Sequence, residues 1–122
     1  MRLLRIDHVQ VTVPRLRERE ARRFYGTVLG LPEIERPKAI PGAGVWFGFE
    51  EGHQLHLVFT DNPMKPPASD HYALIVDDLD AAKRRLADHE VPYQPSPIQD
   101  EYEHIFVEDP FGNRMEFMAP RP

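Results

Sequence analysis

Four side chains with metal-ligand chemistry each interrupt an apolar, strand-like segment of this chain. They are His8, His56, His71 and Glu116. Because side chains alternate along a strand, each of the four points away from the face on which its neighbours pack. Three imidazoles and one carboxylate suit Zn²⁺, Ni²⁺, Fe²⁺, Co²⁺ or Mn²⁺, whereas Ca²⁺ and Mg²⁺ prefer all-oxygen sites. The donor set predicts one divalent metal ion of the first group per site.

These four residues occupy two equivalent positions of an internal repeat. The segment 7–13 aligns with 70–76, and both segments open with Asp-His and end with Val. The segment 52–57 aligns with 112–117, which pairs a histidine with a glutamate in the same strand position. A repeated structural unit therefore uses each of two positions twice.

A structural role has to be weighed against metal binding for each residue. A single histidine beside apolar residues is more often a hydrogen-bonded structural residue than a ligand. Burying a lone carboxylate is costly, so the place of Glu116 inside an apolar strand predicts that a cation faces it. The repeat-related placement of all four donors favours a metal site. Four further residues are expected to contact the substrate: Gln10, Trp46, Tyr102 and His104.

Local patterns predict the same order of elements in both halves. In the first half we expect a strand at 6–13, a helix at 15–30 and strands at 45–49 and 54–60. In the second half we expect a strand at 71–76, a helix capped by Asp77 or Asp78, and strands at 91–94, 103–108 and 114–118. The pattern predicts an α+β fold of two βαβββ modules. At 122 residues the chain has the size of one domain, with modules covering about 1–62 and 68–122.

The composition excludes several functional classes. The chain has no cysteine, so disulfides and thiolate chemistry are excluded. Its net charge of −5 lacks the basic footprint of a nucleic-acid-binding protein, which favours a small-molecule substrate. No apolar run approaches the roughly 18–20 residues of a membrane span, and no secretory signal is evident at the N-terminus. We therefore expect a cytoplasmic protein that binds neither nucleic acid nor membranes.

The chain resembles the vicinal oxygen chelate superfamily, which contains glyoxalase I, bleomycin resistance proteins and extradiol dioxygenases. The resemblance rests on the duplicated module, the Asp-His pair opening each half, the segment 23–31 and the turn 108–113 before Glu116. It implies that the strands form a cup with the helices outside and the metal inside. It also implies that His8 and His71 are first-strand ligands and that Glu116 is the last-strand glutamate.

The resemblance to glyoxalase I implies isomerase or lyase chemistry through a metal-stabilised enediolate, in which a glutamate moves the proton. His56 falls where glyoxalase I carries a glutamate and methylmalonyl-CoA epimerase a glutamine. Only one of the two glutamates remains, so Glu116 is the expected catalytic residue.

Three alternatives stay open. An extradiol dioxygenase would bind Fe²⁺ through His8, His71 and Glu116, with His56 outside the ligand set. A bleomycin-resistance-type protein would bind a drug without metal, and a fosfomycin-resistance-type thiol transferase ranks third because the chain lacks a basic C-terminal extension. Short members of the superfamily commonly build each cup from modules of two chains. The resemblance thus implies a homodimer in which the first two histidines come from one subunit and His71 and Glu116 from the other.

Overall fold

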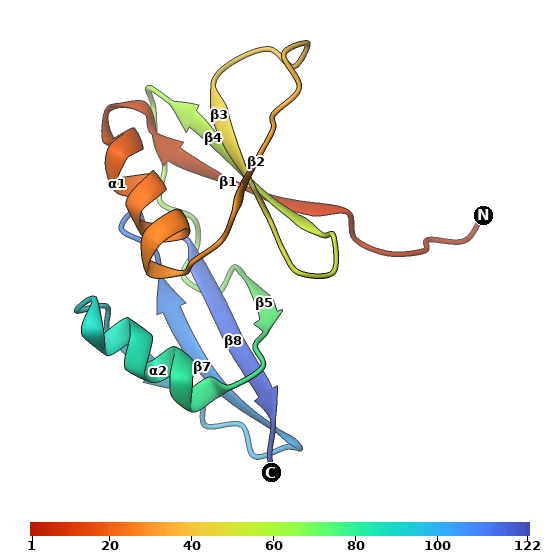
Figure 1. Ribbon diagram of the computed structural model, residues 1–122, viewed down its shortest axis with the longest axis vertical. Coiled ribbons are helices and arrows are strands. Elements are labelled where there is room, and N and C mark those ends of the chain that lie inside the picture. Colours follow the sequence, from red (N-terminus) through yellow and green to blue (C-terminus); the bar gives the residue numbers. More distant parts are fainter. The chain divides into compact units, whose positions relative to one another are not determined.

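The computed structural model describes residues 1–122 and divides them into two compact units, Met1–Met64 and Lys65–Pro122. Each unit contains one four-stranded mixed sheet and one helical segment. Figure 1 shows the course of the chain through both units. Both units follow the order βαβββ, so the predicted α+β fold of two such modules is confirmed. No helix is long and apolar enough to cross a membrane.

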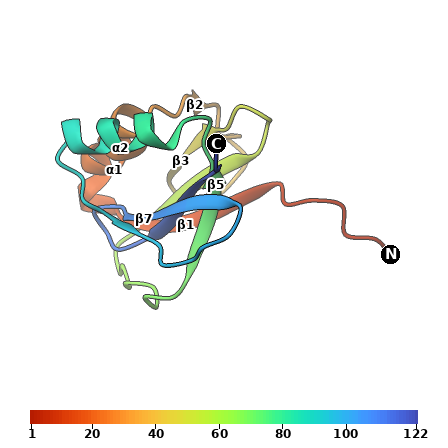
Figure 2. The same cartoon turned by 90° about the horizontal axis from the view of Figure 1, so that it is seen from below.

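The first unit begins with an extended, exposed segment at residues 1–7, which precedes β1 (Figures 1 and 2). Its elements are β1 (His8–Pro14), η1 (Arg15–Arg17), α1 (Glu18–Arg22), η2 (Arg23–Val28), β2 (Glu33–Ile34), β3 (Gly44–Gly48) and β4 (Gln54–Thr60). The strand order is β1-β4-β3-β2, in which β1 pairs with β4 in parallel and the other pairs are antiparallel.

The second unit repeats this arrangement. Its elements are β5 (His71–Ile75), α2 (Leu79–Asp88), β6 (Tyr93–Pro95), β7 (Tyr102–Glu108) and β8 (Arg114–Pro120). The strand order is β5-β8-β7-β6, again with one parallel pair, β5 and β8, beside antiparallel pairs. The parallel pair in each unit is possible because a helix and two further strands connect its members.

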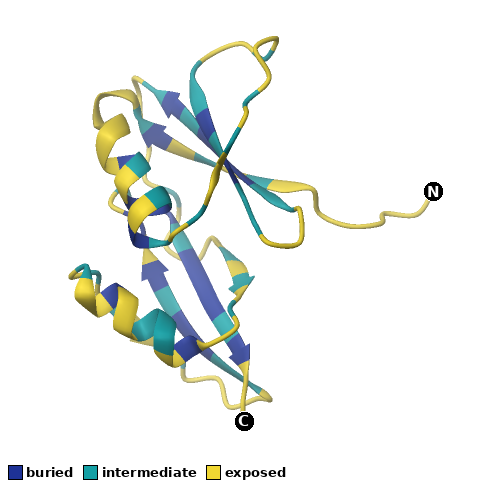
Figure 3. Ribbon diagram, viewed as in Figure 1, coloured by how far each residue is buried: buried dark blue, intermediate teal, exposed yellow.

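One face of each sheet is apolar and covered. Figure 3 marks the buried residues along the strands. In the first unit Leu55, Leu57 and Phe59 on β4 are buried, together with Tyr25 on η2. The equivalent buried residues of β8 are Met115, Phe117 and Ala119. Burying each large apolar side chain contributes about 1.5–3 kcal/mol. The opposite face of each sheet carries the candidate ligands.

The helix expected at 15–30 is divided in the structure. A 3₁₀ turn, a short α-helix and a π-helical segment follow one another, and the amide of Leu29 donates to the carbonyl of Phe24 at 2.9 Å. Gly26 lies in the π-helical segment with β-branched neighbours, which are weak helix formers. Gly30 then ends the segment with a φ of 74°, which glycine adopts without strain.

Two further details of the secondary structure go beyond the sequence-based expectation: a short additional strand and the identity of a helix cap. The short strand Glu33–Ile34 was not assigned from the sequence, because two residues cannot show an alternating pattern. Of the two candidate caps, Asp78 is the N-cap of α2, since its Oδ1 accepts a hydrogen bond from the amide of Ala81 at 3.0 Å.

Candidate functional site

Three aromatic rings are stacked on the open face of the first sheet. The centroids of the Trp46 and His56 rings lie 3.6 Å apart with 4° between their planes. The His56 and His8 rings lie 4.0 Å apart with 19° between their planes. His56 is therefore held between a half-buried indole and an exposed imidazole.

Strand register explains the stack. Trp46 on β3 lies directly opposite His56 on β4 in an antiparallel pair, while β1 brings His8 along the other side of β4. The Nε2 of His56 donates to Oε1 of Gln54 at 2.8 Å. Burial lowers the pKa of His56, and the neighbouring His8 lowers it further, so the ring is neutral at physiological pH.

Glu116 is the centre of the open face of the second sheet. It is only 8% exposed, and its two carboxylate oxygens face different imidazoles. Nδ1 of His104 donates to Oε1 of Glu116 at 2.5 Å, while Nε2 of His71 lies 3.3 Å from Oε2. Phe106 lies opposite Glu116 in the register and contacts the His71 ring edge-to-face. It thus occupies the place that Trp46 has in the first unit.

The Nδ1 atoms of His8 and His71 are both held by oxygen acceptors. His8 Nδ1 donates to the Asp7 carboxylate at 2.9 Å, and His71 Nδ1 donates to the Ser69 carbonyl at 2.9 Å. The bond with His8 also lowers the pKa of Asp7. An Nδ1–H bonded to a carboxylate or carbonyl is the arrangement of metal-binding histidines that ligate through Nε2. His56 differs, because its Nε2 is the bonded nitrogen.

His104 bridges two carboxylates. In addition to Glu116, its Nε2 donates to Oδ1 of Asp100 at 2.8 Å, and both nitrogens of the ring therefore carry hydrogen. The hydrogen bond to Asp100 raises the pKa of His104, burial opposes this, and the bond to Glu116 raises it further. His104, which can carry a positive charge, thus lies beside Glu116, where the sequence predicts a cation.

The turn between β7 and β8 sets the position of Glu116. Oδ1 of Asp109 accepts from the amides of Phe111 and Asn113 at 2.9 and 2.8 Å, and Oδ2 accepts from the Asn113 side chain at 2.8 Å. Gly112 has a φ of 89°, which the tight turn requires. This turn fixes the register in which Phe106 lies opposite Glu116.

The remaining predicted contacts are distributed over the same two faces. Gln10 is exposed on β1, directly opposite His56. Tyr102 is half-buried, and its ring lies 6.3 Å from the ring of His104. His104 itself is 7% exposed, and its two ring nitrogens are hydrogen-bonded to Glu116 and Asp100. Its contact with a substrate stays a prediction. The role of Asp100 was not predicted, since a loop aspartate carries no periodic signal.

Each unit supplies two of the four predicted donors. His8 and His56 are neighbours in the first unit, and His71 and Glu116 are neighbours in the second. No group of three or more such side chains within either unit is arranged to hold a metal ion.

The donors of the second unit fit a metal ion by their chemistry. His71 donates from Nδ1 to the Ser69 carbonyl, and its Nε2 faces the carboxylate oxygen Oε2 of Glu116. An imidazole nitrogen and a carboxylate oxygen that converge in this way can both ligate one metal ion. Their separation of 3.3 Å is also close to the roughly 3 Å expected between neighbouring ligands at metal–ligand bonds of about 2.0–2.2 Å.

Comparison with known proteins adds independent evidence. A family model described as the glyoxalase/bleomycin resistance protein/dioxygenase superfamily matches residues 5–117. No curated protein matches the chain. Among solved structures, a protein from Bacillus anthracis described as a glyoxalase family protein is 34% identical, with a TM-score of 0.90 over 99% of this chain and 100% of that one.

Two more distant structures share the fold. TnmS3, an antibiotic binding protein from Streptomyces sp. CB03234, is 24% identical with a TM-score of 0.76 over 99% of both chains. Lactoylglutathione lyase from Agrobacterium tumefaciens is 22% identical with a TM-score of 0.72 over 94% of this chain and 92% of the other. An enzyme and a binding protein therefore both occur on this fold.

Proposed function

Because the chain belongs to the glyoxalase/bleomycin resistance protein/dioxygenase superfamily, we propose that it is a divalent-metal-dependent enzyme of glyoxalase I-like type. Its substrate is a small molecule that chelates the metal through two neighbouring oxygens. The observation that carries the proposal is the convergence of His71 Nε2 and Glu116 Oε2 at 3.3 Å, while the other polar atom of each group is bonded within the protein.

The ligands we propose are His8, His71 and Glu116. Both histidines have Nδ1 bonded to an oxygen acceptor, which leaves Nε2 for the metal. Two imidazoles and a carboxylate suit Zn²⁺, Ni²⁺, Fe²⁺, Co²⁺ or Mn²⁺. The bound ion would polarise the substrate oxygens as a Lewis acid, and three protein ligands leave coordination positions open for them.

His56 remains the fourth candidate, but its stacking argues for a supporting role. A metal lies in the plane of the imidazole that binds it, at about 2.0–2.1 Å from the nitrogen. The His8 and His56 rings are stacked at 4.0 Å with nearly parallel planes, so an ion in the plane of one ring is displaced from the plane of the other. His56 would have to leave the stack with Trp46 in order to bind the same ion as His8.

Glu116 is the proposed catalytic residue for moving a proton of the substrate in isomerase or lyase chemistry, for which its Oε2 would have to leave the metal because Oε1 is held by His104. Its carboxylate faces the open side of the sheet, and one oxygen is held by His104. The same three ligands also suit an Fe²⁺ dioxygenase, because the stacking of His56 favours the two-histidine, one-carboxylate set. Oxygen uptake with a catechol distinguishes this reaction from proton transfer.

We propose further that the enzyme is a homodimer with shared sites. Each unit contributes only a pair of donors, so each site combines the first unit of one subunit with the second unit of its partner. The prolines of the connecting segment 61–69 favour an extended conformation over a sharp reversal. This arrangement predicts two equivalent sites per dimer.

A metal-free binding protein is the second candidate function. The imidazolium of His104 already neutralises Glu116 without a metal, and the stack of Trp46, His56 and His8 offers a flat aromatic surface. The antibiotic binding protein TnmS3 has the same fold. This candidate predicts binding of a planar drug-like molecule with no requirement for metal.

Metal binding decides between the two functions. Calorimetric titration of the metal-free protein with Zn²⁺, Ni²⁺, Co²⁺, Mn²⁺ and Fe²⁺ is expected to show one ion per chain. His71→Ala should abolish tight binding, whereas His53→Ala, a histidine in the turn before β4, serves as the control and should leave it unchanged. Failure of all five ions to bind would falsify the enzyme proposal and favour the binding protein.

A further inference from the structure

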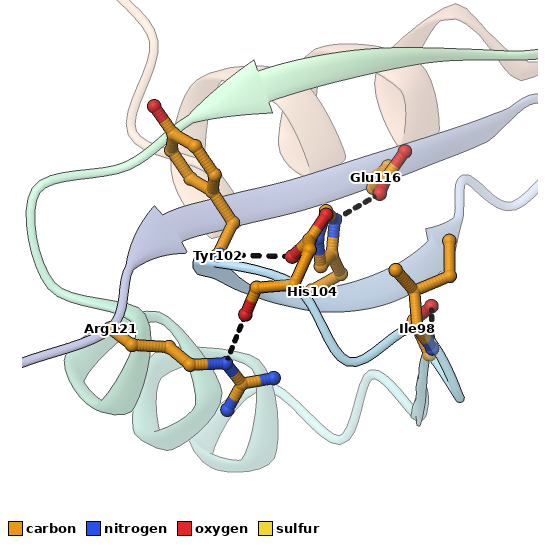
Figure 4. Close-up of polar contacts among 7 residues, drawn as sticks. Ile98, Tyr102, His104, Glu116 and Arg121 are labelled. Atoms are coloured by element: carbon orange, nitrogen blue, oxygen red, sulfur yellow. Dashed lines mark hydrogen bonds and ion pairs between the residues drawn. The ribbon is translucent and has the colours of Figure 1, made fainter.

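The second unit contains a row of hydrogen-bonded charged groups, Asp100, His104 and Glu116, and Figure 4 shows the contact between the last two. Asp100 Oδ1 accepts from His104 Nε2 at 2.8 Å, and His104 Nδ1 donates to Glu116 Oε1 at 2.5 Å. A carboxylate can only accept at these positions, so the ring donates in both directions. The His104 and Glu116 side chains are 6% and 10% exposed, whereas the Asp100 side chain at the outer end of the row is 46% exposed.

Asp100 is itself held by one backbone donor and one side-chain donor. Its side chain accepts from the amide of Tyr102 at 2.9 Å, and its carbonyl accepts from Nε of Arg121 at 2.9 Å. The amide of Arg121 donates to the carbonyl of Glu101 at 2.9 Å. The C-terminal segment thus anchors the loop that carries Asp100, as Figure 4 shows for Arg121.

The first unit shows that the fold does not require this row. In the strand register, His104 lies opposite Met118 on β8 while its counterpart Gly44 lies opposite Val58 on β4. The first unit builds the same four-stranded sheet with no side chain at this position. Its counterpart of Glu116 is His56, an imidazole in place of a carboxylate. The sheet therefore forms without a histidine at this position, and His104 is present only in the unit that carries the carboxylate Glu116.

The two carboxylate oxygens of Glu116 have different partners. Oε1 is occupied by His104, while Oε2 lies 3.3 Å from Nε2 of His71. We propose that Asp100 and His104 act as a positioning pair that holds Oε1 and thereby directs Oε2 toward the ligand position beside His71. The inference rests on the proposed metal site and makes Glu116 a ligand through a single oxygen.

The pair of variants His104→Gln and Asp100→Asn tests this role. His104→Gln keeps a donor but cannot bond both carboxylates, and we expect it to weaken Co²⁺ binding about 10- to 100-fold, as losses of ligand-orienting partners do. The absorption spectrum of bound Co²⁺ should also change, because Glu116 can then bind through either oxygen. Asp100→Asn removes a charge from an exposed loop residue, preserves folding and should cause a smaller change in the same direction.

Glu103→Gln provides the matched control. It removes a charged hydrogen bond of the same length, 2.5 Å to Lys83, from the residue next to His104. It should lower stability and leave Co²⁺ affinity and spectrum unchanged. Equal losses of affinity in Glu103→Gln and His104→Gln would mean a general structural effect and would overturn the positioning role.

Heteronuclear NMR of the metal-free protein tests the row independently of the metal. Both ring nitrogens of His104 should carry a proton, and a single protonated nitrogen would contradict the inference. If the wild type binds Co²⁺ tightly and both variants match it, the positioning role is wrong while the proposed function stands. If the wild type binds no metal, the proposed function itself is wrong, and the inference falls with it.

Discussion

The indole of Trp46 lies flat against the imidazole of His56, with 3.6 Å between ring centroids and 4° between planes. Trp46 is the single tryptophan of the chain, so tryptophan fluorescence, excited at a wavelength that tyrosine does not absorb, reports on this stack alone. We expect Co²⁺ or Ni²⁺ bound at His8 to quench the emission of Trp46. Ions with open d shells quench the fluorescence of a nearby indole, and only the His56 ring lies between His8 and Trp46.

This quenching should saturate at one ion per chain and disappear in His8→Ala. Mg²⁺, which prefers all-oxygen sites, is the control and should have no effect. Tight Ni²⁺ binding in calorimetry without any change in Trp46 emission would place the ion elsewhere.

Replacing His56 by phenylalanine separates stacking from ligation. His56→Phe keeps a flat ring between Trp46 and His8 but has no nitrogen, whereas His56→Ala removes the stack. If His56 supports His8, the Phe variant should bind metal within a few-fold of the wild type and the Ala variant about 10- to 100-fold more weakly. Calorimetry measures both affinities. Equal and complete loss in the two variants would identify His56 as a ligand.

Mixing two inactive variants tests the shared site. His8→Ala and Glu116→Ala each damage a different half of the donor set, and subunits exchanged between them should form mixed dimers with one intact site. We expect metal binding to return in those dimers, at half the sites, as measured by Co²⁺ absorption after co-refolding. Mixed dimers that bind no metal would show that all donors of a site belong to one chain.

Gly44 is required for the close approach of β3 to β4. A Cβ at this position would collide with the backbone carbonyl of Leu57, so Gly44→Ala must displace one strand. We expect a loss of roughly 1–3 kcal/mol in the free energy of unfolding, as for other overpacked sites, and a changed Trp46 emission. Urea denaturation followed by fluorescence measures both.

Gly26→Ala is the control for this substitution. Its Cβ would meet only the edge of the Phe47 ring at 3.6 Å, an ordinary contact. Since alanine also favours helical structure over glycine, Gly26→Ala should be neutral or stabilising. Equal destabilisation by the two substitutions would contradict the role assigned to Gly44.

The ion pair between Lys83 on α2 and Glu103 on β7 predicts a pH-dependent part of stability. Their hydrogen bond lowers the pKa of Glu103 below its ordinary 4.5 and raises the pKa of Lys83 above its ordinary 10.5. The Glu103 contribution is therefore present above pH 4.5 and is lost as the pH falls through the lowered pKa. The Lys83 contribution is present below pH 10.5 and is lost as the pH rises through the raised pKa.

The size of this effect is limited by solvent, because the Glu103 side chain is 40% exposed. We expect Glu103→Gln to lower stability by no more than about 1 kcal/mol near neutral pH and by less near about pH 3. Urea denaturation at both pH values measures the difference, and the exposed Glu101→Gln is the control. A Glu103→Gln effect that grows in acid would have the wrong sign for this ion pair.

The sequence alone determined the repeated architecture and the four candidate donors. Alternating apolar residues identify strands because one face of a half-covered sheet must be buried, and this pattern located Gln54–Thr60 with the bounds seen in the structure. The same alternation places His56 and Glu116 on the face opposite their buried neighbours. Weak local signals failed where two residues form a strand, at Glu33–Ile34, and where one helix is replaced by three short helical segments.

Only the tertiary structure decided which groups contact the side chains of His56 and Glu116. The stack on His56 depends on the register of three strands, and the imidazolium beside Glu116 depends on β7 bringing His104 across from β8. Asp100 joins them through a loop whose position is set by Arg121, a residue far along the chain. Such contacts carry no sequence period, because hydrogen bonds and ring contacts act over a few ångströms between residues that only the folded sheets bring together.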